Sequence, residues 1–498
     1  CRSVIVPSLM TDRPASLQEA PAAAAAPASR GEGGHIVFAP LRLTLVGLGI
    51  SVVPLDTAVN IAFPDITGSF GLPIPMIQWV VICYVLTHAG LMLAFGRIGD
   101  MWGHARVFRA GLAWSVAAFL LCAAAPSFGW LLFFRFLQGI SAGLIVSCAP
   151  ALVTGLYPEA RRSHALGMFT LIYALGSAVG PLLGGVLVAR WGWPAVFWFR
   201  APIALASLMF LRGLPSARGA GAEQRFDTPG ALLLAVGLAT LLLGINSLSR
   251  LAGGDYRALP LFAVALVSLA LFVHWERRAA QPIVRIELFR RPGFALINIA
   301  SGVMYLMTFS VMLIAPFFFP RYTHLTLREV GLVLGTGFIA MAAASPLAGR
   351  LVRHLPAARV GAGGALLAGA GLFLVGSWGP ATSPPLMAAA LALQGFGTGF
   401  FQVSYMEVVM AASPLAHRGV AGSLSMLTRT IGVVLGAALL TLGFQAIQSA
   451  AQAAGDPAAF LTAFHAIFRM AGVAAALTGV LVAWSARRAA AGNAGDGL

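Results

Sequence analysis

Lysine is absent from this 498-residue chain, and charged residues of either sign are scarce. They make up 10% of the sequence, whereas soluble domains carry about 25%. Without lysine the chain cannot form the Gly-x-x-x-x-Gly-Lys-Ser/Thr loop that binds ATP phosphates. The 32 arginines outnumber the 16 acids and give a net charge of +16. They stand singly between apolar runs, which argues against nucleic-acid binding, because such a surface gathers basic and stacking side chains.

Cysteine and histidine are also too few and too scattered to build a reactive centre. Cysteine occurs only at positions 1, 83, 122 and 148, without a CxxC pair, and the last three lie in apolar runs. We expect those three to be buried as small hydrophobic side chains. None of the nine histidines stands with a carboxylate, cysteine or serine at metal-ligand or nucleophile spacing. We therefore predict no metal site, no cofactor and no enzyme active site.

Apolar residues are abundant, at 59% of the chain. They form runs of about 20 residues, which is the length of a membrane-spanning helix and about twice that of a barrel strand. Backbone groups inside a bilayer must be paired within the protein, so only helices and closed barrels can span it. These observations predict an all-α membrane protein.

Fourteen apolar spans follow an Ala/Pro-rich tail of residues 1–40, which lacks the apolar segment of a signal peptide. The first eight lie at about 43–63, 77–97, 106–125, 130–154, 165–189, 194–211, 229–249 and 258–275. The last six lie at about 293–319, 330–351, 360–378, 385–411, 420–446 and 466–486. With the N-terminus inside, inner loops and tails hold 23 arginines and outer loops hold 5. The positive-inside rule therefore predicts an even number of spans and two cytoplasmic termini.

An internal repeat relates the two ends of this array. The segment LQGISAGL at 137–144 matches LQGFGTGF at 393–400, an offset of 256 residues that also pairs Gly176 with Gly432 and Gly180 with Gly436. Parallel repeats of this kind are typical of transporters with a site between the halves. We predict five regions: a disordered tail (1–40), a six-helix bundle (41–212), a two-helix insertion (213–292), a second six-helix bundle (293–487) and a disordered C-terminal tail (488–498).

Four segments carry recognisable motifs. They are PLDTAVNIAFPDI (54–66) in span 1, GRIGDMWGHARVF (96–108) after span 2, RFLQGISAG (135–143) in span 4 and GSAVGPLLGG (176–185) in span 5. Together they resemble the major facilitator superfamily, in particular its fourteen-span drug:proton antiporter branch of the multidrug efflux type. The resemblance covers roughly residues 42–486 and implies two six-helix bundles with two inserted central helices.

Two of these motifs have roles implied by the resemblance. The loop after span 2 is similar to the cytoplasmic latch of the superfamily and would use Gly96, Gly99, Asp100, Gly103 and Arg106. Its glycines permit tight turns and close helix contact. The span 5 segment is similar to the motif of the superfamily's antiporters and would use Gly176, Gly180, Pro181, Gly184 and Gly185. Three of these glycines fall four residues apart, on one helix face.

Charges inside spans are costly and usually functional. The acids within spans are Asp56 and Glu407, and the arginines are Arg135, Arg200, Arg429 and Arg469. We place Asp56, Arg135 and Arg200 around one polar pocket and expect Asp56 to carry the coupling proton. A permanent structural ion pair is the alternative, and Arg200 could instead bind an anionic substrate. Glu407 and Arg429 could form an inner gate or a structural salt bridge.

Substrate contacts are predicted on spans expected to face the centre. The candidates are Tyr305, Phe309, Phe401, Gln402 and Tyr405, although aromatic residues also pack against lipid and neighbouring helices.

The predicted function is export of small hydrophobic or amphipathic compounds by proton antiport across the bacterial cell inner (cytoplasmic) membrane. One alternative is a dedicated exporter of one endogenous metabolite or organic anion, and another is a transport-inactive membrane sensor. The expected partners are the lipid bilayer, the substrate and protons, with no nucleic acid. The chain would act as a monomer or with periplasmic adaptor and outer-membrane proteins.

Overall fold

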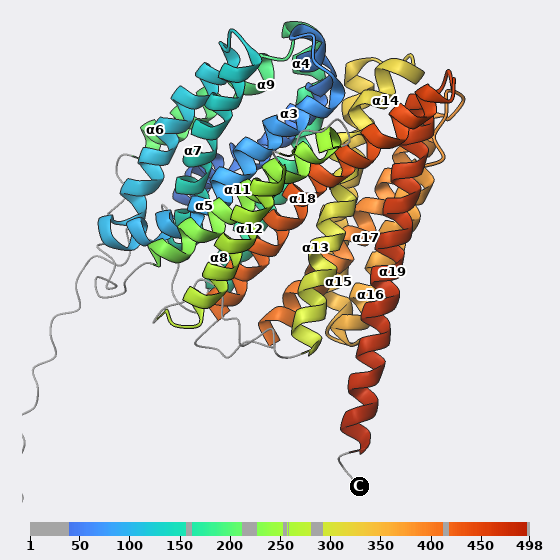
Figure 1. Cartoon of the computed structure of the whole chain (residues 1–498). Helices are drawn as coiled ribbons and strands as arrows, with labels where there is room; N and C mark the ends of the chain where they lie inside the picture. Colours follow the sequence, from blue (N-terminus) through green and yellow to red (C-terminus); the bar gives the residue numbers. More distant parts are fainter. Residues whose placement is uncertain are drawn as a thin grey trace, which may run out of the picture. The chain divides into compact units, whose positions relative to one another are not determined.

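The computed structural model describes residues 39–155, 162–211, 227–251, 256, 258–279, 292–411 and 418–495. The chain divides into two compact units, Cys1–Pro40 and Leu41–Leu498. Nearly all of the predicted N-terminal tail lies outside the described residues, so the prediction of disorder there stays untested. The second unit is helical almost throughout its described part (Figure 1).

The first half of this unit contains the elements up to α10. They are α2 (Ala39–Ser51), η1 (Pro54–Thr57), α3 (Ala58–Ile61), α4 (Phe63–Ser69), η2 (Ile74–Ile77), α5 (Gln78–Trp102), α6 (His104–Ala123), α7 (Phe128–Gly155), α8 (Arg162–Trp191), α9 (Ala195–Trp198) and α10 (Arg200–Phe210). Glycine ends α5, because Gly103 adopts φ +92° between α5 and α6, a conformation that side-chain-bearing residues rarely adopt.

The remaining helices follow two helices in the middle of the sequence. The middle pair is α11 (Thr228–Leu251) and α12 (Ala258–Glu276). The second half contains α13 (Pro292–Leu313), α14 (Ala315–Tyr322), α15 (Leu327–Leu351), α16 (Ala357–Val375), α17 (Pro384–Ala411), α18 (Arg418–Ala453) and α19 (Ala459–Gly495). Helix α19 extends past residue 487, where the sequence analysis expected a disordered tail, because its last residues are rich in alanine, a strong helix former.

Three of the predicted spans are interrupted instead of continuous. Span 1 is divided into α2, η1 and α3, span 6 into α9 and α10, and span 9 into α13 and α14. Proline explains the breaks in spans 1 and 9, because Pro54 and Pro316 stand just after them and lack the N–H that would continue the helix. Each of the three is still one apolar stretch, Thr44–Ile61, Ala195–Phe210 and Gly293–Tyr322.

Helix pairing repeats in the two halves. In the first half α5 packs on α7, α6 on α7 and on α10, and α8 on η1 and α3. In the second half the corresponding contacts are α15 with α17, α16 with α17 and α19, and α18 with α13. These are the contacts expected if each helix of one half has a counterpart in the other.

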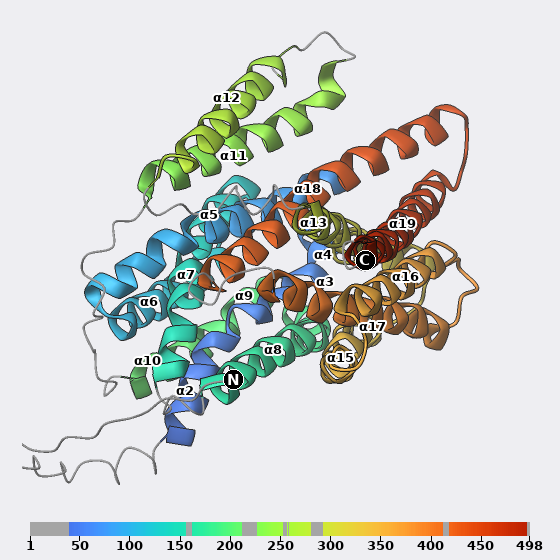
Figure 2. The ribbon, with the colours of Figure 1, turned by 90° about the horizontal axis from the view of Figure 1, so that it is seen from below.

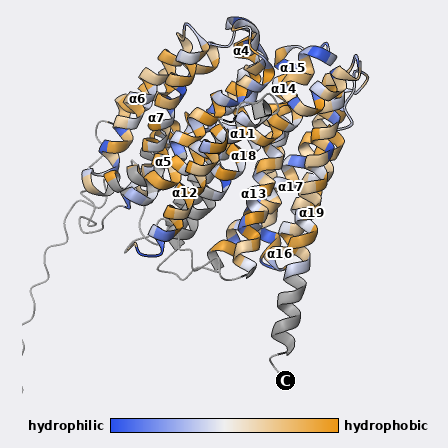
Figure 3. Cartoon of the chain, in the orientation of Figure 1, coloured by the Kyte–Doolittle hydropathy of each residue, from blue (hydrophilic) through white to orange (hydrophobic). Residues whose placement is uncertain are grey.

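The helices have the length and surface of membrane-spanning segments. Ten spans in the described part are long and apolar enough to cross a bilayer, or eleven if the bent pair Phe63–Ser69 and Ile74–His88 is one span. Three further apolar helices in the described part are shorter, Leu175–Trp191, Ala195–Phe210 and Leu232–Ile245. Apolar residues cover the helices along their lengths, with hydrophilic ones mainly towards the ends (Figure 3). A count of fourteen spans remains a prediction.

Large apolar side chains are exposed around the bundle, as lipid contact requires. Phe210 is 69% exposed and Leu266 is 72% exposed, whereas soluble monomers rarely expose large contiguous apolar patches. The pair α11 and α12 lies at the edge of the bundle (Figure 2). Helix α11 contacts α5 and α18, while only 22% of α12 is buried. The middle pair therefore touches both halves and leaves α12 largely on the outside.

Candidate functional site

Asp56 lies at the break in span 1, in the single 3-10 turn Pro54–Thr57. Pro54 opens this turn, because a proline N–H is not available to continue helix α2. The turn places the carboxylate among α7, α9 and α10, and its side chain is 13% exposed. The break thus positions an acid inside the bundle at a point where the backbone is not a regular α-helix.

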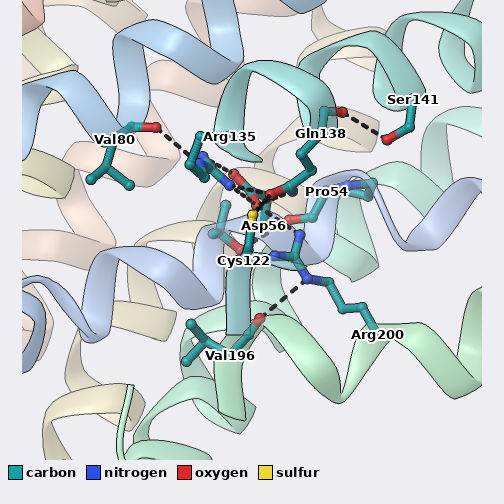
Figure 4. Close-up of polar contacts among 10 residues, drawn as sticks. Pro54, Asp56, Val80, Cys122, Arg135, Gln138, Ser141, Val196 and Arg200 are labelled. Carbon is teal, nitrogen blue, oxygen red and sulfur yellow. Dashed lines mark hydrogen bonds and ion pairs between the residues drawn. The ribbon is translucent and has the colours of Figure 1, made fainter. Parts of the chain in front are cut away.

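Two arginines bind the Asp56 carboxylate directly (Figure 4). Arg135 on α7 donates from Nη1 to Oδ1 at 2.7 Å and from Nη2 to Oδ2 at 2.8 Å. Arg200, the first residue of α10, donates from Nη1 to Oδ1 at 2.7 Å. The arrangement combines one bidentate and one single contact, the strongest class of protein hydrogen bond. The predicted proximity of these three side chains is therefore found in the structure.

Gln138 completes the shell around the acid, and the sequence analysis did not single it out. Its amide donates to Asp56 Oδ1 at 2.9 Å, and its carbonyl accepts from Arg135 Nη1 at 2.8 Å. Arg135 Nε also donates to the Val80 carbonyl of α5 at 2.9 Å, and Arg200 Nε donates to the Val196 carbonyl at 3.2 Å. Asp56 therefore accepts four hydrogen bonds from three side chains.

The two guanidinium groups are enclosed by aromatic rings. Arg135 lies 4.3 Å from the centroid of the Tyr84 ring, and Arg200 lies 4.5 Å from that of Phe119. Both arginine side chains are buried, yet Arg200 Nη2 has no hydrogen-bond partner in the described part. One carboxylate between two guanidinium groups leaves a net charge of +1 in this cluster. Cation–π contacts offset part of the desolvation of the second arginine.

The glycine face of α8 packs against the turn that carries Asp56. A Cβ at Gly176 would lie 2.7 Å from Pro54 Cγ, and one at Gly184 would lie 2.9 Å from the Ala58 carbonyl oxygen. Gly180 lies against Thr57 and Ala58, with no room for a side chain. Helix α8 continues through Pro181. The predicted close contact of this motif with a neighbouring span is thus found, and the neighbour is span 1.

Gly185 faces the other half of the chain. A Cβ there would clash with the Leu327 carbonyl oxygen at the start of α15, and a Cβ at Gly331 would lie 2.6 Å from the Pro181 carbonyl oxygen. The motif therefore joins span 1 on one face and α15 on the adjacent face.

The second half repeats the glycine contact in simpler form. A Cβ at Gly432 would lie 2.6 Å from the Gly302 carbonyl oxygen, and one at Gly436 would lie 2.9 Å from that of Leu306. Helix α18 thus packs on α13 as α8 packs on span 1. The second half has Ala437 where the first half has Pro181.

The loop predicted as a latch is described only in part. Gly99 packs against His104 and Cys148, Gly103 forms the turn between α5 and α6, and Arg106 is exposed. Gly96 is more open, with its nearest contact at Ser147. The side chain of Asp100 lies outside the described part of the structure, so the electrostatic latch stays a prediction.

The two inner-gate candidates are not joined by an ion pair in the described residues. Glu407 is exposed on α17, and Arg429 on α18 lies 5.6 Å from the centroid of the Tyr305 ring. A gate formed by these two groups would need a different conformation from this one.

The substrate candidates divide into two sets. Phe401 and Tyr405 are each 2% exposed and stack on one another at 6.4 Å, and the Tyr405 hydroxyl donates to Asn298 Oδ1 at 2.9 Å. They belong to the packed core of the second half in this structure. Tyr305, Phe309 and Gln402 are only partly buried. Their roles in substrate binding remain predictions.

Comparison with known proteins identifies the family. The profile described as Major Facilitator Superfamily matches twice, at residues 45–295 and 297–496. The two matches follow the two halves in which the helix pairing repeats, and together they span most of the chain.

The chain is also similar to curated transport and resistance proteins over about four fifths of its length. The chain is 30% identical over 406 residues to the multidrug resistance protein Stp of Mycobacterium tuberculosis, covering 80% of this chain and 75% of that protein. It is 28% identical to the tetracenomycin C resistance and export protein of Streptomyces glaucescens, covering 80% and 74%. It is also 27% identical to the riboflavin transporter RibZ of Clostridioides difficile, covering 81% and 87%.

Solved structures show the same fold at low sequence identity. The crystal structure of a peptide transporter POT matches with a TM-score of 0.69 at 16% identity, covering 91% of this chain and 94% of that one. An inward-facing bacterial homologue of the human lysosomal transporter Spinster matches with a TM-score of 0.64 at 16% identity, covering 89% and 95%. The chain therefore belongs to the Major Facilitator Superfamily and is a multi-pass membrane transporter, not an enzyme.

Proposed function

We propose that this transporter is a proton antiporter of the fourteen-span drug:proton branch. It exports small hydrophobic or amphipathic compounds across the bacterial cell inner membrane, with both termini in the cytoplasm. The proton gradient is its energy source, and no cofactor is required. The names of its relatives support export, because they include multidrug resistance proteins and an antibiotic resistance and export protein.

The observation that carries the proposal is the bonding of Asp56. In this structure its two oxygens accept four hydrogen bonds, three of them from Arg135 and Arg200. A proton can bind a carboxylate so enclosed only after at least one donor has moved away. Protonation is then linked to the position of the helices that carry the arginines, which is the link that antiport needs.

The helix contacts supply a route for that movement. Arg135 and Arg200 stand on α7 and α10, while Asp56 stands on a separate turn that packs against α8. Rocking of the two halves would shift α8 against α15 and change the position of the Asp56 turn relative to both arginines. Protonation of Asp56 would thereby be coupled to the movement that exposes the substrate site.

The test is a proton-flux assay in proteoliposomes with a preformed pH gradient. Lipophilic cations, neutral antibiotics and organic acids are added in turn to wild type, Asp56→Asn and Glu329→Gln. We expect at least one compound to collapse the gradient with wild type and Glu329→Gln, and none with Asp56→Asn. Glu329 is the control acid, because it is exposed at the start of α15 and glutamine can keep its capping box. Equal flux with Asp56→Asn would reject Asp56 as the proton carrier.

A narrower substrate range is the second candidate. The similarity to a riboflavin transporter favours a dedicated exporter of one metabolite or organic anion. Competition distinguishes the two readings, because a multidrug exporter accepts many chemically unrelated competitors and a dedicated one accepts few. Binding without transport of any compound would favour the sensor alternative instead. Copurification would show whether the protein acts alone or with periplasmic adaptor and outer-membrane proteins.

A further inference from the structure

Arg429 is a half-buried cation without a counter-ion in the described part of the chain. It stands on α18, and its guanidinium carbon lies 5.6 Å from the centroid of the Tyr305 ring on α13. No hydrogen bond or ion pair to another described residue involves Arg429. The acids of the described spans do not serve it, because Asp56 is held by two other arginines and Glu407 is exposed on α17. An unpaired guanidinium at membrane depth is costly, which indicates a functional charge.

His88 on α5 is a second polar group left without a partner. Its Nε2 atom is buried and makes no hydrogen bond within the described part. The imidazole stacks on Tyr84 with ring centroids 6.0 Å apart and an angle of 20° between planes. Tyr84 also lies against Arg135 of the Asp56 cluster, 4.3 Å from the guanidinium carbon to the ring centroid. The His88 ring is therefore next to a ring that contacts the proton site proposed above.

The two helices that carry His88 and Arg429, α5 and α18, pack on each other. Ile82 of α5 is buried with Val434, Ala437 and Ala438 of α18, in a cluster that joins the two halves. His88 stands six residues after Ile82, and Arg429 stands five residues before Val434. Each is thus about one and a half turns from the apolar contact along its own helix. The α5–α18 packing thus brings both groups to the contact between the two halves.

A tyrosine ring lies beside each of the two groups. Tyr305 on α13 lies under Arg429, and Tyr84 on α5 stacks on His88. These side chains come from both halves: α5 from the first, α13 and α18 from the second. A site that spans both halves is where a transported molecule must bind if their relative movement is to expose it on alternate sides.

The net charge of the region selects the sign of the substrate. Arg429 carries one positive charge, and the cluster of Asp56, Arg135 and Arg200 carries a further net charge of +1. In a low-dielectric interior such a charge repels cations and attracts anions. Guanidinium is also the group that matches the planar, two-oxygen geometry of a carboxylate.

We propose that Arg429, together with His88 and the tyrosines around it, binds an anionic group of an aromatic substrate, and that the protein takes organic anions. Arg429 pairs with a carboxylate or sulfonate, His88 donates a hydrogen bond to it, and the aromatic rings contact the body of the molecule. The physiological direction of transport rests on the proposed function, whereas the binding itself does not.

The test compares ligands that differ only in charge. The protein in lipid nanodiscs is titrated with 1-naphthoate and with 1-naphthylmethylammonium, and binding is measured by calorimetry. We expect wild type to bind naphthoate at least about tenfold more tightly, and Arg429→Gln to lose at least about tenfold of that affinity. Arg429→Lys keeps the charge but not the two parallel N–H donors, so its naphthoate affinity should lie between those of wild type and Arg429→Gln. His88→Phe keeps the stack on Tyr84 and should bind naphthoate severalfold more weakly than wild type.

The control is Arg469→Gln, which removes another span arginine whose Nε donates to the Gly376 carbonyl. Its naphthoate affinity should stay within about twofold of wild type, a change of less than 0.5 kcal/mol. Equal binding of both probes by wild type would overturn the proposal, as would an Arg429→Gln affinity equal to that of Arg469→Gln. The wild-type comparison needs no variant, so it holds even if Arg429→Gln fails to fold.

Failure of this inference and failure of the proposed function give different results. Naphthoate binding without any proton-linked flux would reject antiport and leave the anion site in place. Proton-linked transport of naphthylmethylammonium but not of naphthoate would reject the anion site and leave antiport in place.

Discussion

Two adjacent glycines of α8 offer a test of how the halves move. Gly184 faces the turn of span 1 in its own half, and Gly185 faces Leu327 at the start of α15 in the other half. The Cβ of an alanine at Gly185 would clash with the Leu327 carbonyl oxygen and lie 3.0 Å from the Leu327 carbonyl carbon. Both atoms are backbone, so the neighbouring helix must shift to admit the methyl group.

The size of the effect follows from that overlap. Overpacking by one methyl group costs about 1–3 kcal/mol, which corresponds to a shift of roughly 5- to 150-fold in a two-state equilibrium. Because the clash exists only where α8 meets α15, Gly185→Ala should favour the conformation in which they separate. Gly184→Ala carries a similar clash, with the Ala58 carbonyl oxygen at 2.9 Å. That clash lies within one half, so it should lower stability without moving the halves apart.

Spin labels on either side of the contact would measure the separation. Arg190 and His324 are both exposed, one near the end of α8 and the other just before α15. In a variant without native cysteines, labels at these two positions should give a longer distance distribution for Gly185→Ala than for wild type or Gly184→Ala. An unchanged distribution in folded Gly185→Ala protein would refute the reasoning, since the contact would then not resist separation.

Two further predictions concern stability. Gln138→Leu should lower the free energy of unfolding by about 1–3 kcal/mol, because it removes a hydrogen bond to Asp56 and another from Arg135. The thermal midpoint in detergent checks this against Gln402→Leu, since Gln402 makes no hydrogen bond in the described residues. At the start of α19, bonds from the Ala458 N–H and the Thr462 hydroxyl hold the pKa of Asp456 below its ordinary value. The stability that Asp456 contributes is therefore present above pH ~4 and lost as pH falls through its lower folded pKa, so the midpoints of wild type and Asp456→Ala should converge on acidification. A gap that stays constant or widens in acid would contradict the second prediction.

The long apolar runs of the chain predict its helices well, because a helix that spans a bilayer needs about 20 consecutive apolar residues. The charged cluster was predictable for a related reason. Charges in spans are so few that Asp56, Arg135 and Arg200 had few possible partners other than each other. Their contacts in the structure agree with that placement, although their role in proton transfer is a separate question.

Other features depend on details that composition does not carry. Pro54 was visible in the sequence, but a proline can kink a membrane helix or break it, and neighbouring helices decide which. Gln138 follows Arg135 by three residues on the same helix face. Its amide is uncharged, however, and the sequence does not show which charged group it contacts. Phe401 and Tyr405 were expected to face the substrate, whereas Asn298 and the close approach of α16 hold them in the core. Residue type does not reveal which side of a buried helix faces a neighbour.

The 3-10 turn of span 1 has a mechanical consequence. The Thr57 hydroxyl, next in sequence to Asp56, lies 3.0 Å from the Ser177 carbonyl of α8 and 3.0 Å from that of Pro54. A bend in α8 would therefore move Thr57 and, through the one peptide bond between the two residues, Asp56. A short turn without a full α-helical ladder can also rotate more readily than an intact helix. Hydrogen bonding at the Asp56 carboxylate and the tilt of the 30-residue helix α8 are therefore linked through a single side chain, that of Thr57.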